Sequence, residues 1–567
     1  MPIRISPLAL IALVPMTVLC LLVAGLLWIS VQQGIIGTTA AHYTLDNYSA
    51  LFFDNTLPGI LLNTALFAIT ATAVALAIGL PVAWLVERSD LKAKAAVYAL
   101  MSTGVLIPGI YVAMGWTFVA HPRIGFINTW LQSGFGPDGP ILDLTSPVGM
   151  GLVQGLSYVP LTFILSVQTF RAMNPSLEEA ARLHGLSLWS TIRRVTLPLA
   201  RPGILAALIY ILTIAVATFD IPAVLGMGNR VYVLSTYLYF KTQPSGGAGG
   251  PEYGITAALG TCMILVALGL TAWYAQVLRQ GHRYQVVTGK GYRPAQLSLG
   301  RWAIAAWVLI VTYGLLAEFL PLVMIAFAAF TPYLVPPTPE SLALLGLTNF
   351  QRLDMGLVLR GLRNTILLVV VVPVVVVGLA FCTSWLVVRS KRRLRYALEF
   401  GAFLPHTLPE VILAISALLV ALFVVGRLVP LYGSVWLIAI VYVVGRLAFA
   451  TRSFNAAFLQ VHRELEEAAF VSGLSMLRTA WRVLVPLLRP TLLSVWLWTA
   501  VLVYRELTVA VFLVGQESIT LPAAIWSFWA AGGRNQAAAV TLVMTAVLIP
   551  LLLVFWLFGR RSDVRLA

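Results

Sequence analysis

The sequence predicts an all-helical integral membrane protein with twelve transmembrane helices, arranged as two parallel repeats of six. Three observations support this prediction. Of the 567 residues, 60% are hydrophobic, the apolar residues form long uninterrupted segments, and the two halves of the chain resemble each other. Only 10% of residues are charged, against about 25% in a soluble domain. Together with a mean hydropathy of +0.91, this excludes a large soluble domain.

Twelve segments approach or exceed the roughly 20 apolar residues that a helix needs to cross a bilayer. Unpaired backbone groups cannot face lipid, so each segment is expected to be helical. The first segment is too long for the apolar core of a signal peptide, and we expect it to remain in the protein. The segments are 8–30, 60–86, 95–119, 147–170, 203–225, 254–277, 302–330, 364–388, 397–424, 431–451, 491–514 and 537–558.

Basic residues predict how these segments are oriented. The net charge is +16, and 27 of the 37 Lys and Arg residues fall on one side when the loops are assigned alternately to the two sides. Positive charge marks the cytoplasmic side, so both termini are predicted to be cytoplasmic. The three cysteines lie singly in apolar segments, and the six histidines form no short-spaced cluster. We therefore predict neither a disulfide framework nor a bound cofactor.

The internal repeat is visible at two offsets. Asn63 and Thr64 recur as Asn364 and Thr365, and the offset of 301 still holds for Pro108 and Pro409. Further along, residues 177–204 match residues 465–492 at 15 of 28 positions with an offset of 288. The first half therefore carries 13 extra residues between its third and fourth spans. Each half has six helices and starts from the cytoplasmic side, so the two repeats are parallel.

The repeated segment connects the fourth and fifth spans of each half, on the predicted cytoplasmic side. Acidic residues suit the first turn of a helix, alanines favour the helix and leave a low profile, and a glycine can end it. We expect a short helix, a glycine turn and a second helical stretch that ends near the proline. The residues concerned are Glu179, Ala180, Ala181, Gly185 and Pro198, and Glu467, Ala468, Ala469, Gly473 and Pro486. An amphipathic helix on the membrane surface is the alternative. Such a helix would not require the same spacing of Glu-Ala-Ala, Gly and Pro in both halves.

This pattern of Glu-Ala-Ala, three residues, Gly and a later Leu-Pro or Val-Pro resembles the signature of permeases of binding-protein-dependent ABC importers of type I. The fused twelve-helix arrangement resembles the ferric-iron permeases of that superfamily, which are related to thiamine and phosphonate permeases. The resemblance implies that each loop docks on one of two cytoplasmic ATPase subunits and that a periplasmic binding protein delivers the substrate. It implies a multi-pass protein of the bacterial inner membrane, whose halves rock between inward-open and outward-open states.

The resemblance also divides the chain into parts. We expect two ABC-type transmembrane domains, each preceded by a span with an outer loop, a basic cytoplasmic linker between the halves and a cytoplasmic tail. In chain order the parts are 1–58, 59–277, 278–301, 302–359, 360–558 and 559–567. The chain is not expected to be an enzyme. The nearest fragment to a nucleotide-binding phosphate loop, 288–291, lacks its leading Gly and its Ser or Thr, so ATP would be used by a partner subunit.

Carboxylates inside spans are costly and mark candidate functional sites. Asp220, Glu410 and Glu506 are candidates for the translocation pathway, while Glu318 in the seventh span can equally lie at the outer interface. Oxygen ligands suit a hard cation such as ferric iron. An ion pair that merely holds the helices together, through Arg446 or Arg505, is an equally open interpretation.

The sequence leaves other functions open. Within importers, ferric iron is favoured, and thiamine, 2-aminoethylphosphonate and polyamines are alternatives. A secondary transporter can also consist of two parallel six-helix repeats, but it would need no doubled loop for an ATPase. A membrane-embedded enzyme is disfavoured because the sequence has neither a nucleophile motif nor a metal-ligand cluster.

Overall fold

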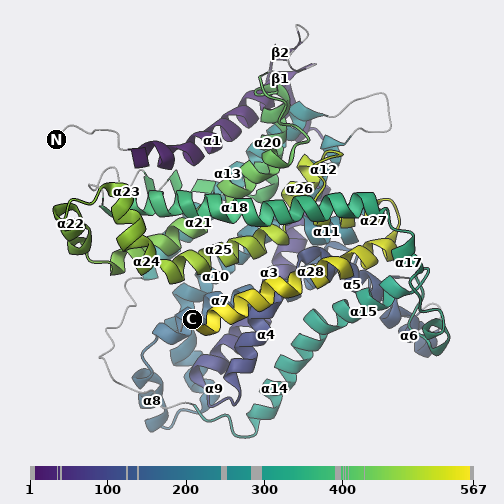
Figure 1. The fold of residues 1–567 in the computed structure, drawn as a ribbon. Coiled ribbons are helices and arrows are strands. Elements are labelled where there is room, and N and C mark those ends of the chain that lie inside the picture. The colour runs from purple at the N-terminus through teal and green to yellow at the C-terminus, as the bar shows by residue number, and fades with distance from the viewer. Residues whose placement is uncertain are drawn as a thin grey trace. The chain divides into compact units, whose positions relative to one another are not determined.

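The structure is a computed structural model of the chain, and it is almost entirely helical (Figure 1). One antiparallel pair of two-residue strands, β1 (Gln32–Gln33) and β2 (His42–Tyr43), is its only sheet among the described residues. The structure describes residues 7–34, 36, 38, 41–122, 125–136, 139–243, 252–281, 297–389, 398–399, 401–402, 404–405, 408–426 and 428–561. Most of the predicted linker and tail, and the Gly-rich run 245–250, lie outside these residues.

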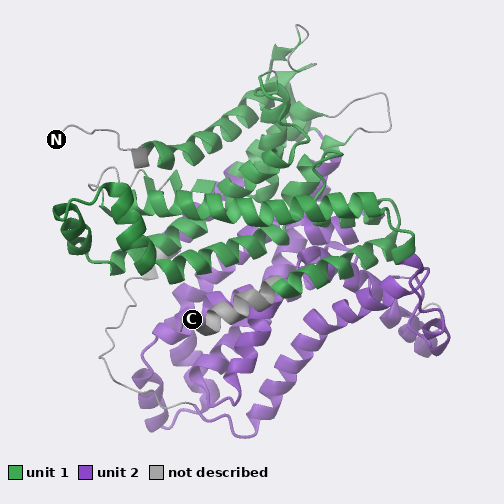
Figure 2. Ribbon diagram, viewed as in Figure 1, with its two compact units in different colours: residues 1–53, 241–264, 350–567 green, residues 54–240, 265–349 purple. Residues whose placement is uncertain are grey.

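The chain forms two compact units, each assembled from separate stretches of sequence (Figure 2). Unit 1 comprises residues 1–53, 241–264 and 350–567, and unit 2 comprises residues 54–240 and 265–349. The helix α13 (Tyr253–Gly281) contributes to both. Neither unit is therefore a continuous half of the chain.

Unit 2 contains the helices of the first repeat together with those of residues 302–342. Its helices are α3 (Leu57–Arg88), α4 (Lys94–Leu106), α5 (Gly109–Ala120), α6 (Phe126–Phe135), α7 (Pro147–Ala172), α8 (Ser176–Leu183), α9 (Leu188–Thr191), the π-helix η1 (Ile192–Thr196), α10 (Leu197–Ala217), α11 (Asp220–Leu225), the 3-10 helix η2 (Met227–Asn229), most of α12 (Leu234–Thr242), α14 (Trp302–Tyr313), the π-helix η4 (Gly314–Phe319), α15 (Leu320–Phe330) and α16 (Pro339–Leu342). The short helix α17 (Thr348–Gln351) lies where unit 2 passes into unit 1.

Unit 1 contains the helices of the second repeat together with those of the first 53 residues. Its helices are α1 (Pro7–Ser30), α2 (Asp46–Phe52), α18 (Met355–Arg389), α20 (Glu410–Phe423), α21 (Val435–Gln460), α22 (Arg463–Val471), α23 (Met476–Thr479), the π-helix η5 (Ala480–Leu484), α24 (Val485–Leu487), α25 (Arg489–Tyr504), α26 (Thr508–Leu513), α27 (Leu521–Ala530) and α28 (Arg534–Arg561).

The helices agree with the predicted membrane architecture. Within the described residues, eight helices are long and apolar enough to cross a membrane, and two bent pairs bring the number to ten. The short apolar helix α20 and the long helix α28 occupy the two remaining predicted segments. The twelve predicted segments therefore all contain helix, in two sets that follow the sequence repeat.

Besides the segment 397–424, which is not helical at Leu408 and Pro409, three predicted spans are not single straight helices. The third is bent by 95° between α4 and α5, where Pro108 stands in extended conformation before α5. The predicted segments 203–225 and 491–514 are interrupted: α10 ends at Ala217 and α25 at Tyr504, and the short helices α11 and α26 follow. Hydropathy could not reveal these breaks because the short helices are as apolar as the spans they follow.

The predicted helix end near Pro198 is wrong, because one helical run continues from Leu188 to Ala217. The π turn of η1 lies just before this proline and widens the helix. A proline lacks the backbone N–H and crowds the preceding turn of an α-helix, and the wider turn makes room for it. Near Pro486 the run does end soon afterwards, at Leu487, with a bend of 80°.

The first helix of each repeat packs in the unit of the other repeat. In unit 1, α1 packs on α18 and α20, and in unit 2 α15 packs along α5. Glycines permit both contacts: a Cβ atom on Gly25 would lie 2.3 Å from Cγ2 of Val420, and one on Gly115 would lie 2.4 Å from Cβ of Pro321. The sequence repeat did not predict this exchange, since it compares positions along the chain and not partners in space.

The repeated Asn-Thr pair anchors the helix that follows the broken span. In unit 2, the hydroxyl of Thr64 accepts a hydrogen bond of 2.9 Å from the backbone N–H of Leu234, the first residue of α12. In unit 1, Thr365 accepts one of 2.8 Å from Leu521, the first residue of α27. Because the first N–H groups of a helix have no partner within it, the two threonines perform the same structural task.

The contact between α1 and α20 can be tested with a double-mutant cycle. Gly25→Ala places a methyl group against Val420 and should lower the free energy of unfolding by about 1–3 kcal/mol, the usual cost of overpacking. In a Val420→Ala background the clashing methyl group is gone, and the same change should cost almost nothing. Thermal unfolding in detergent measures both values.

Gly378→Ala in α18 is the matched control, because a Cβ atom there meets open space. It should leave the unfolding midpoint nearly unchanged or raise it slightly, since alanine favours a helix over glycine. An equal cost of Gly25→Ala in both backgrounds would contradict the packing of α1 on α20.

Candidate functional site

The two copies of the repeated loop have the same backbone conformation. The helices α8 and α22 each end at a glycine in left-handed conformation, with φ +83° at Gly185 and +80° at Gly473. The next residue donates its N–H five residues back, from Leu186 to the carbonyl of Ala181 (3.1 Å) and from Leu474 to that of Ala469 (3.0 Å). This pattern is the Schellman motif, which closes a helix end and usually requires glycine. The predicted helix and glycine turn are both present.

One face of each short helix is buried. Glu178 and Ala181 are buried in α8, and Glu466 and Ala469 are buried in α22. Of the two signature glutamates, Glu467 is exposed and paired with Arg463 at 3.0 Å, whereas Glu179 is half-buried. The residue that tethers each loop is therefore the glutamate before the signature, at positions 178 and 466.

In the first loop, Arg88 holds Glu178. The arginine lies at the end of α3, and its Nε donates to the carboxylate of Glu178 at 3.0 Å, with a second donation from an amino group. The hydroxyl of Thr196 donates to the other carboxylate oxygen at 2.6 Å. Arg88 also donates to the carbonyl of Met173 at 3.4 Å, at the end of α7. Both charged side chains are buried, with exposures of 6% and 3%.

In the second loop, Arg389 holds Glu466 in the same way. The arginine at the end of α18 donates to the carboxylate at 2.9 and 2.6 Å and to the carbonyl of Val461, at the end of α21, at 2.9 Å. The third donor differs, because it is the indole N–H of Trp385, 3.0 Å from the carboxylate. We call each of these arginine–glutamate pairs, with its third donor, a clamp.

Each clamp joins three elements: the second span of the repeat, the end of the fourth span and the short helix of the loop. A buried ion pair is expensive to desolvate, and it holds only where further hydrogen bonds satisfy both partners. Removing one partner leaves an unpaired buried charge and typically costs about 3–5 kcal/mol. The clamps therefore make the loops rigid extensions of the membrane helices.

The sequence contains a signal for the clamps that neither hydropathy nor the loop signature reveals. Arg88 and Arg389 follow the repeat at an offset of 301, and Glu178 and Glu466 follow it at 288. Taken alone, the glutamate at 178 indicates only a favourable charge at a helix start. The arginine recurs at the offset of 301 and the glutamate at the offset of 288. Two equivalent ion pairs, one in each repeat, would produce this pattern.

The clamps differ in their third donor. The position equivalent to Thr196 is Leu484, which cannot donate. Conversely, the indole N–H of Trp84, equivalent to that of Trp385, is buried and has no hydrogen-bond partner within the described part of the chain. Each repeat thus satisfies its glutamate with a side chain that the other repeat does not use.

The candidate carboxylates Asp220 and Glu506 lie at the breaks of their spans. Asp220 is the first residue of α11. Glu506 lies between α25 and α26, where its carboxylate accepts from the N–H of Val509 at 3.2 Å. The third candidate, Glu410, is the first residue of α20, after Pro409. All three therefore stand where helices begin, near N–H groups without helical partners.

In unit 1, one arginine brings two of the candidates together. Arg446 of α21 donates to Glu410 at 2.5 Å and to Glu506 at 2.7 Å. The side chain of Glu410 is 41% exposed, whereas those of Arg446 and Glu506 are 16% and 8% exposed. The cluster is thus a buried ion pair with a second, accessible carboxylate.

The equivalent place in unit 2 has a different chemistry. Tyr158 stands at the position of Arg446, and its hydroxyl is hydrogen-bonded to that of Thr218. Gly109 stands at the position of Glu410, and the carboxylate of Asp220 lies directly against it: a Cβ atom on Gly109 would be 2.8 Å from Oδ2. Unit 2 thus presents one carboxylate where unit 1 presents two and an arginine.

Glu318 is buried near the middle of the helical run of α14, η4 and α15, and not at its end. Its Oε1 has no hydrogen-bond partner among the described residues. The carboxylate faces Gly104, on which a Cβ atom would lie 2.5 Å from Oε1. Within the described residues, no three His, Cys, Asp or Glu side chains gather as a metal site.

Comparison with known proteins identifies the class. The family described as the inner membrane component of binding-protein-dependent transport systems matches residues 75–280 and 375–567. The chain belongs to this family, and it contains the family's domain twice. The chain is therefore an inner membrane component with several helices that are long and apolar enough to cross the membrane.

Individual relatives are more distant. The chain is 24% identical over 80% of its length to the ferric transport system permease protein FbpB of Actinobacillus pleuropneumoniae, covering 64% of that protein. It is 26% identical over 80% of its length to the probable ABC transporter permease protein y4fN of Sinorhizobium fredii, covering 79% of it. A putative ferric transport system permease protein, FbpB 1 of Haemophilus influenzae, is 24% identical and is covered to 63%. The chain thus spans less than two thirds of the two ferric permeases.

The difference between the clamps predicts that replacing tryptophan with phenylalanine has unequal effects at the equivalent positions 84 and 385. Trp385→Phe removes a hydrogen bond to a buried carboxylate, and such bonds contribute about 1.5–3 kcal/mol. Trp84→Phe makes the same change of shape without losing a bond. We expect Trp385→Phe to lower the free energy of unfolding in detergent by about 1.5–3 kcal/mol more than Trp84→Phe. Equal losses would show that the indole N–H of Trp385 does not hold Glu466.

Proposed function

We propose that this chain is the permease subunit of an ATP-driven importer and that its two repeated loops are the docking sites for two cytoplasmic ATPase subunits. One observation carries the proposal: each loop presents apolar side chains to solvent at equivalent positions while a clamp fixes its other face. Leu183 and Val471 are 89% and 90% exposed, and Trp189 and Leu477 are both 70% exposed. Exposed apolar groups mark a surface that contacts a protein or a membrane, and the buried clamps, which a helix lying on the membrane would not need, favour a protein partner.

The rigid attachment supports a mechanical role. A docking helix transmits movement only if it cannot turn independently of the span to which it is attached. Each clamp ties its loop to two spans of the same repeat. Movement of the two ATPase subunits on ATP binding would thus pass directly into both sets of helices and switch the pathway between its inward-open and outward-open states.

The family and the sequence support the partners that we propose. A permease of a binding-protein-dependent system works with a periplasmic binding protein, which delivers the substrate. The chain has no phosphate loop of its own, so ATP hydrolysis belongs to separate subunits. The positive-inside rule predicts that both termini and both loops are cytoplasmic. We propose that residues 59–277 and 360–558 form the two transmembrane domains that carry out this transport.

Ferric iron is the cargo that we propose. The ferric permeases among the relatives support it, as do Asp220, Glu410 and Glu506, because carboxylate oxygens suit a hard cation. In this proposal the accessible Glu410 contacts the cation first. When no cation is bound, Arg446 balances the negative charges of Glu410 and Glu506. Thiamine, 2-aminoethylphosphonate and polyamines remain the alternative cargoes.

The glycine turn gives a test of coupling. The space around the Cβ position of both Gly185 and Gly473 is open, so backbone conformation, and not bulk, is the constraint. Valine in left-handed conformation is strained by about 1–3 kcal/mol, whereas asparagine tolerates it. In the assembled complex, replacing both glycines with Val should reduce binding-protein-stimulated ATP hydrolysis and uptake at least about tenfold, and replacing both with Asn should preserve most of each.

Insertion in the membrane should be equal in both double variants. Wild-type stimulation of the Val variant would contradict the coupling role of the loops. If the Asn variant were as impaired as the Val variant, the backbone conformation would not be what the glycines provide.

The acidic cluster gives a test of the pathway. The triple variant Glu410→Gln, Arg446→Gln and Glu506→Gln removes the arginine together with both carboxylates that it contacts, so the destabilisation that follows loss of one partner is reduced. The half-buried Arg505, which interacts with Glu410, keeps its charge. We expect this protein to fold and to hydrolyse ATP on addition of loaded binding protein, but to lose uptake of ferric iron. Uptake is measured in proteoliposomes with radioactive iron.

Uptake at the wild-type rate would make the cluster a structural ion pair. The cargo itself is checked independently by isolating the partner binding protein and identifying its ligand by mass spectrometry. A ligand other than iron would overturn the iron proposal and leave the importer proposal intact.

A further inference from the structure

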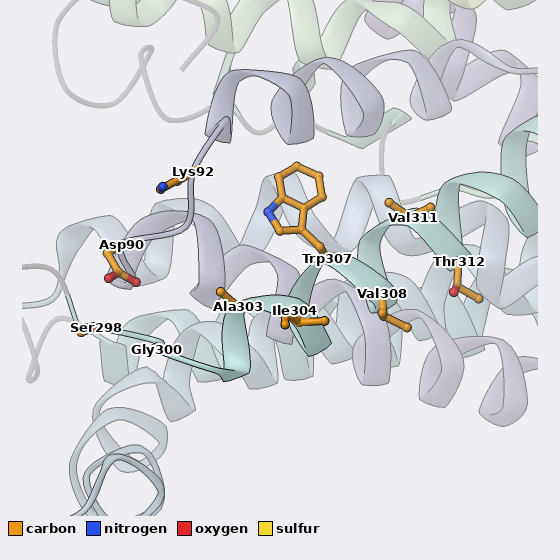
Figure 3. A pocket seen from close by; sticks show the side chains of 10 residues that line it. All are labelled: Asp90, Lys92, Ser298, Gly300, Ala303, Ile304, Trp307, Val308, Val311 and Thr312. Atoms are coloured by element: carbon orange, nitrogen blue, oxygen red, sulfur yellow. The ribbon is translucent and has the colours of Figure 1, made fainter.

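A pocket of about 720 Å³ lies in unit 2 beside the start of α14 (Figure 3). Asp90, Lys92, Ser298 and Gly300 form one part of its lining, and residues of α14 form the rest. The pocket thus extends from a polar turn that follows α3 onto the side of a helix that is apolar and long enough to span a membrane. Such a pocket matches an amphiphile and not a small polar solute.

The polar part is held in shape by the chain on either side. Ser89 and Leu297 form a parallel bridge: Leu297 donates to the carbonyl of Arg88 at 3.0 Å, and Asp90 donates to that of Leu297 at 3.1 Å. The carboxylate of Asp90 accepts from the N–H of Leu299 at 2.9 Å. This backbone hydrogen bond holds the pKa of Asp90 below its usual value. The carboxylate is exposed and negatively charged at neutral pH.

The apolar part is one stripe of α14. Ile304, Val308 and Val311 are 74%, 60% and 50% exposed, and they repeat at the spacing that keeps side chains on one helix face. Trp307 also lines the pocket, and its side chain projects from α14 (Figure 3). Tryptophan favours the boundary between headgroups and hydrocarbon, so its place agrees with a polar end in the headgroup layer. From Ile304 to Val311 the helix rises about 10 Å.

We propose that this groove binds one phospholipid with a zwitterionic headgroup that ends in a primary ammonium, that is, phosphatidylethanolamine. The phosphate meets Lys92, the ammonium donates to Asp90, and an acyl chain lies along Ile304, Val308 and Val311. Both charges of the groove are then matched. A purely anionic headgroup would leave Asp90 opposed by negative charge, and a trimethylated headgroup has no N–H to donate.

The position of the groove gives the lipid a consequence for the loop. Asp90 is two residues from Arg88, whose side chain holds Glu178 and whose carbonyl holds Leu297. A lipid bound at Asp90 therefore braces the turn from which the first clamp projects.

The test compares lipids on the whole protein. The full chain is stripped of lipid in detergent, incubated with equal amounts of phosphatidylethanolamine, phosphatidylglycerol and phosphatidylcholine of identical acyl chains, and analysed by native mass spectrometry. We expect phosphatidylethanolamine to be retained preferentially. Asp90→Asn and Lys92→Gln should each weaken its retention by about tenfold, the usual effect of losing a hydrogen bond to a charged group.

Two matched controls separate the groove from its surroundings. Arg301→Gln removes an exposed neighbouring charge that does not line the pocket and should leave retention unchanged. Val308→Trp fills the apolar part and should abolish retention, whereas Ala305→Trp adds the same bulk to an exposed position of α14 outside the pocket and should not. Thermal unfolding confirms that each variant folds.

Three results would overturn the proposal. They are equal retention of phosphatidylglycerol with no effect of Asp90→Asn, equal retention of phosphatidylcholine, and equal loss for Val308→Trp and Ala305→Trp. The first would indicate an anionic lipid attracted by Lys92 alone, and the last would indicate non-specific lipid on the surface of α14.

Discussion

A buried carboxylate held by an arginine at the end of a transmembrane helix is the interaction on which the remainder of this structure depends. It occurs twice, as Arg88 with Glu178 and as Arg389 with Glu466. The desolvation cost of such a pair is recovered only when every polar atom finds a partner, so the geometry around it has little freedom. The same arginines also bond the ends of α7 and α21. Two spans and a loop are thereby fixed to each other at one point.

The sequence predicted the parts of the fold that depend on composition and spacing along the chain. Hydropathy located the helical segments, and the repeat located both loops. It could not predict which helices pack together, because the close contact of Gly25 with Val420 joins residues with no relation in the alignment of the two halves. Nor could it predict the breaks before Asp220 and Glu506, since the short helices beyond them are equally apolar.

The two repeats are alike at the proposed docking surfaces and different at the proposed pathway residues. The exposed positions 183 and 471 are both apolar, and Gly185 and Gly473 share one backbone conformation. By contrast, Arg446 in one unit corresponds to Tyr158 in the other. Two identical ATPase subunits would require equivalent docking surfaces, whereas a single ion passing through one pathway imposes no symmetry on the residues that line it.

This division explains why the candidate sites differ in how well the sequence could identify them. A loop under the same constraint in both halves appears twice, so its Glu, Ala and Gly residues could be recognised by repetition alone. A carboxylate such as Glu410 has no counterpart, because Gly109 occupies its place in the other repeat. Its partner Arg446 is 36 residues away and on another helix. Only the folded chain brings these charges together, so a candidate pathway site of this kind can be found from the structure and not from the repeat.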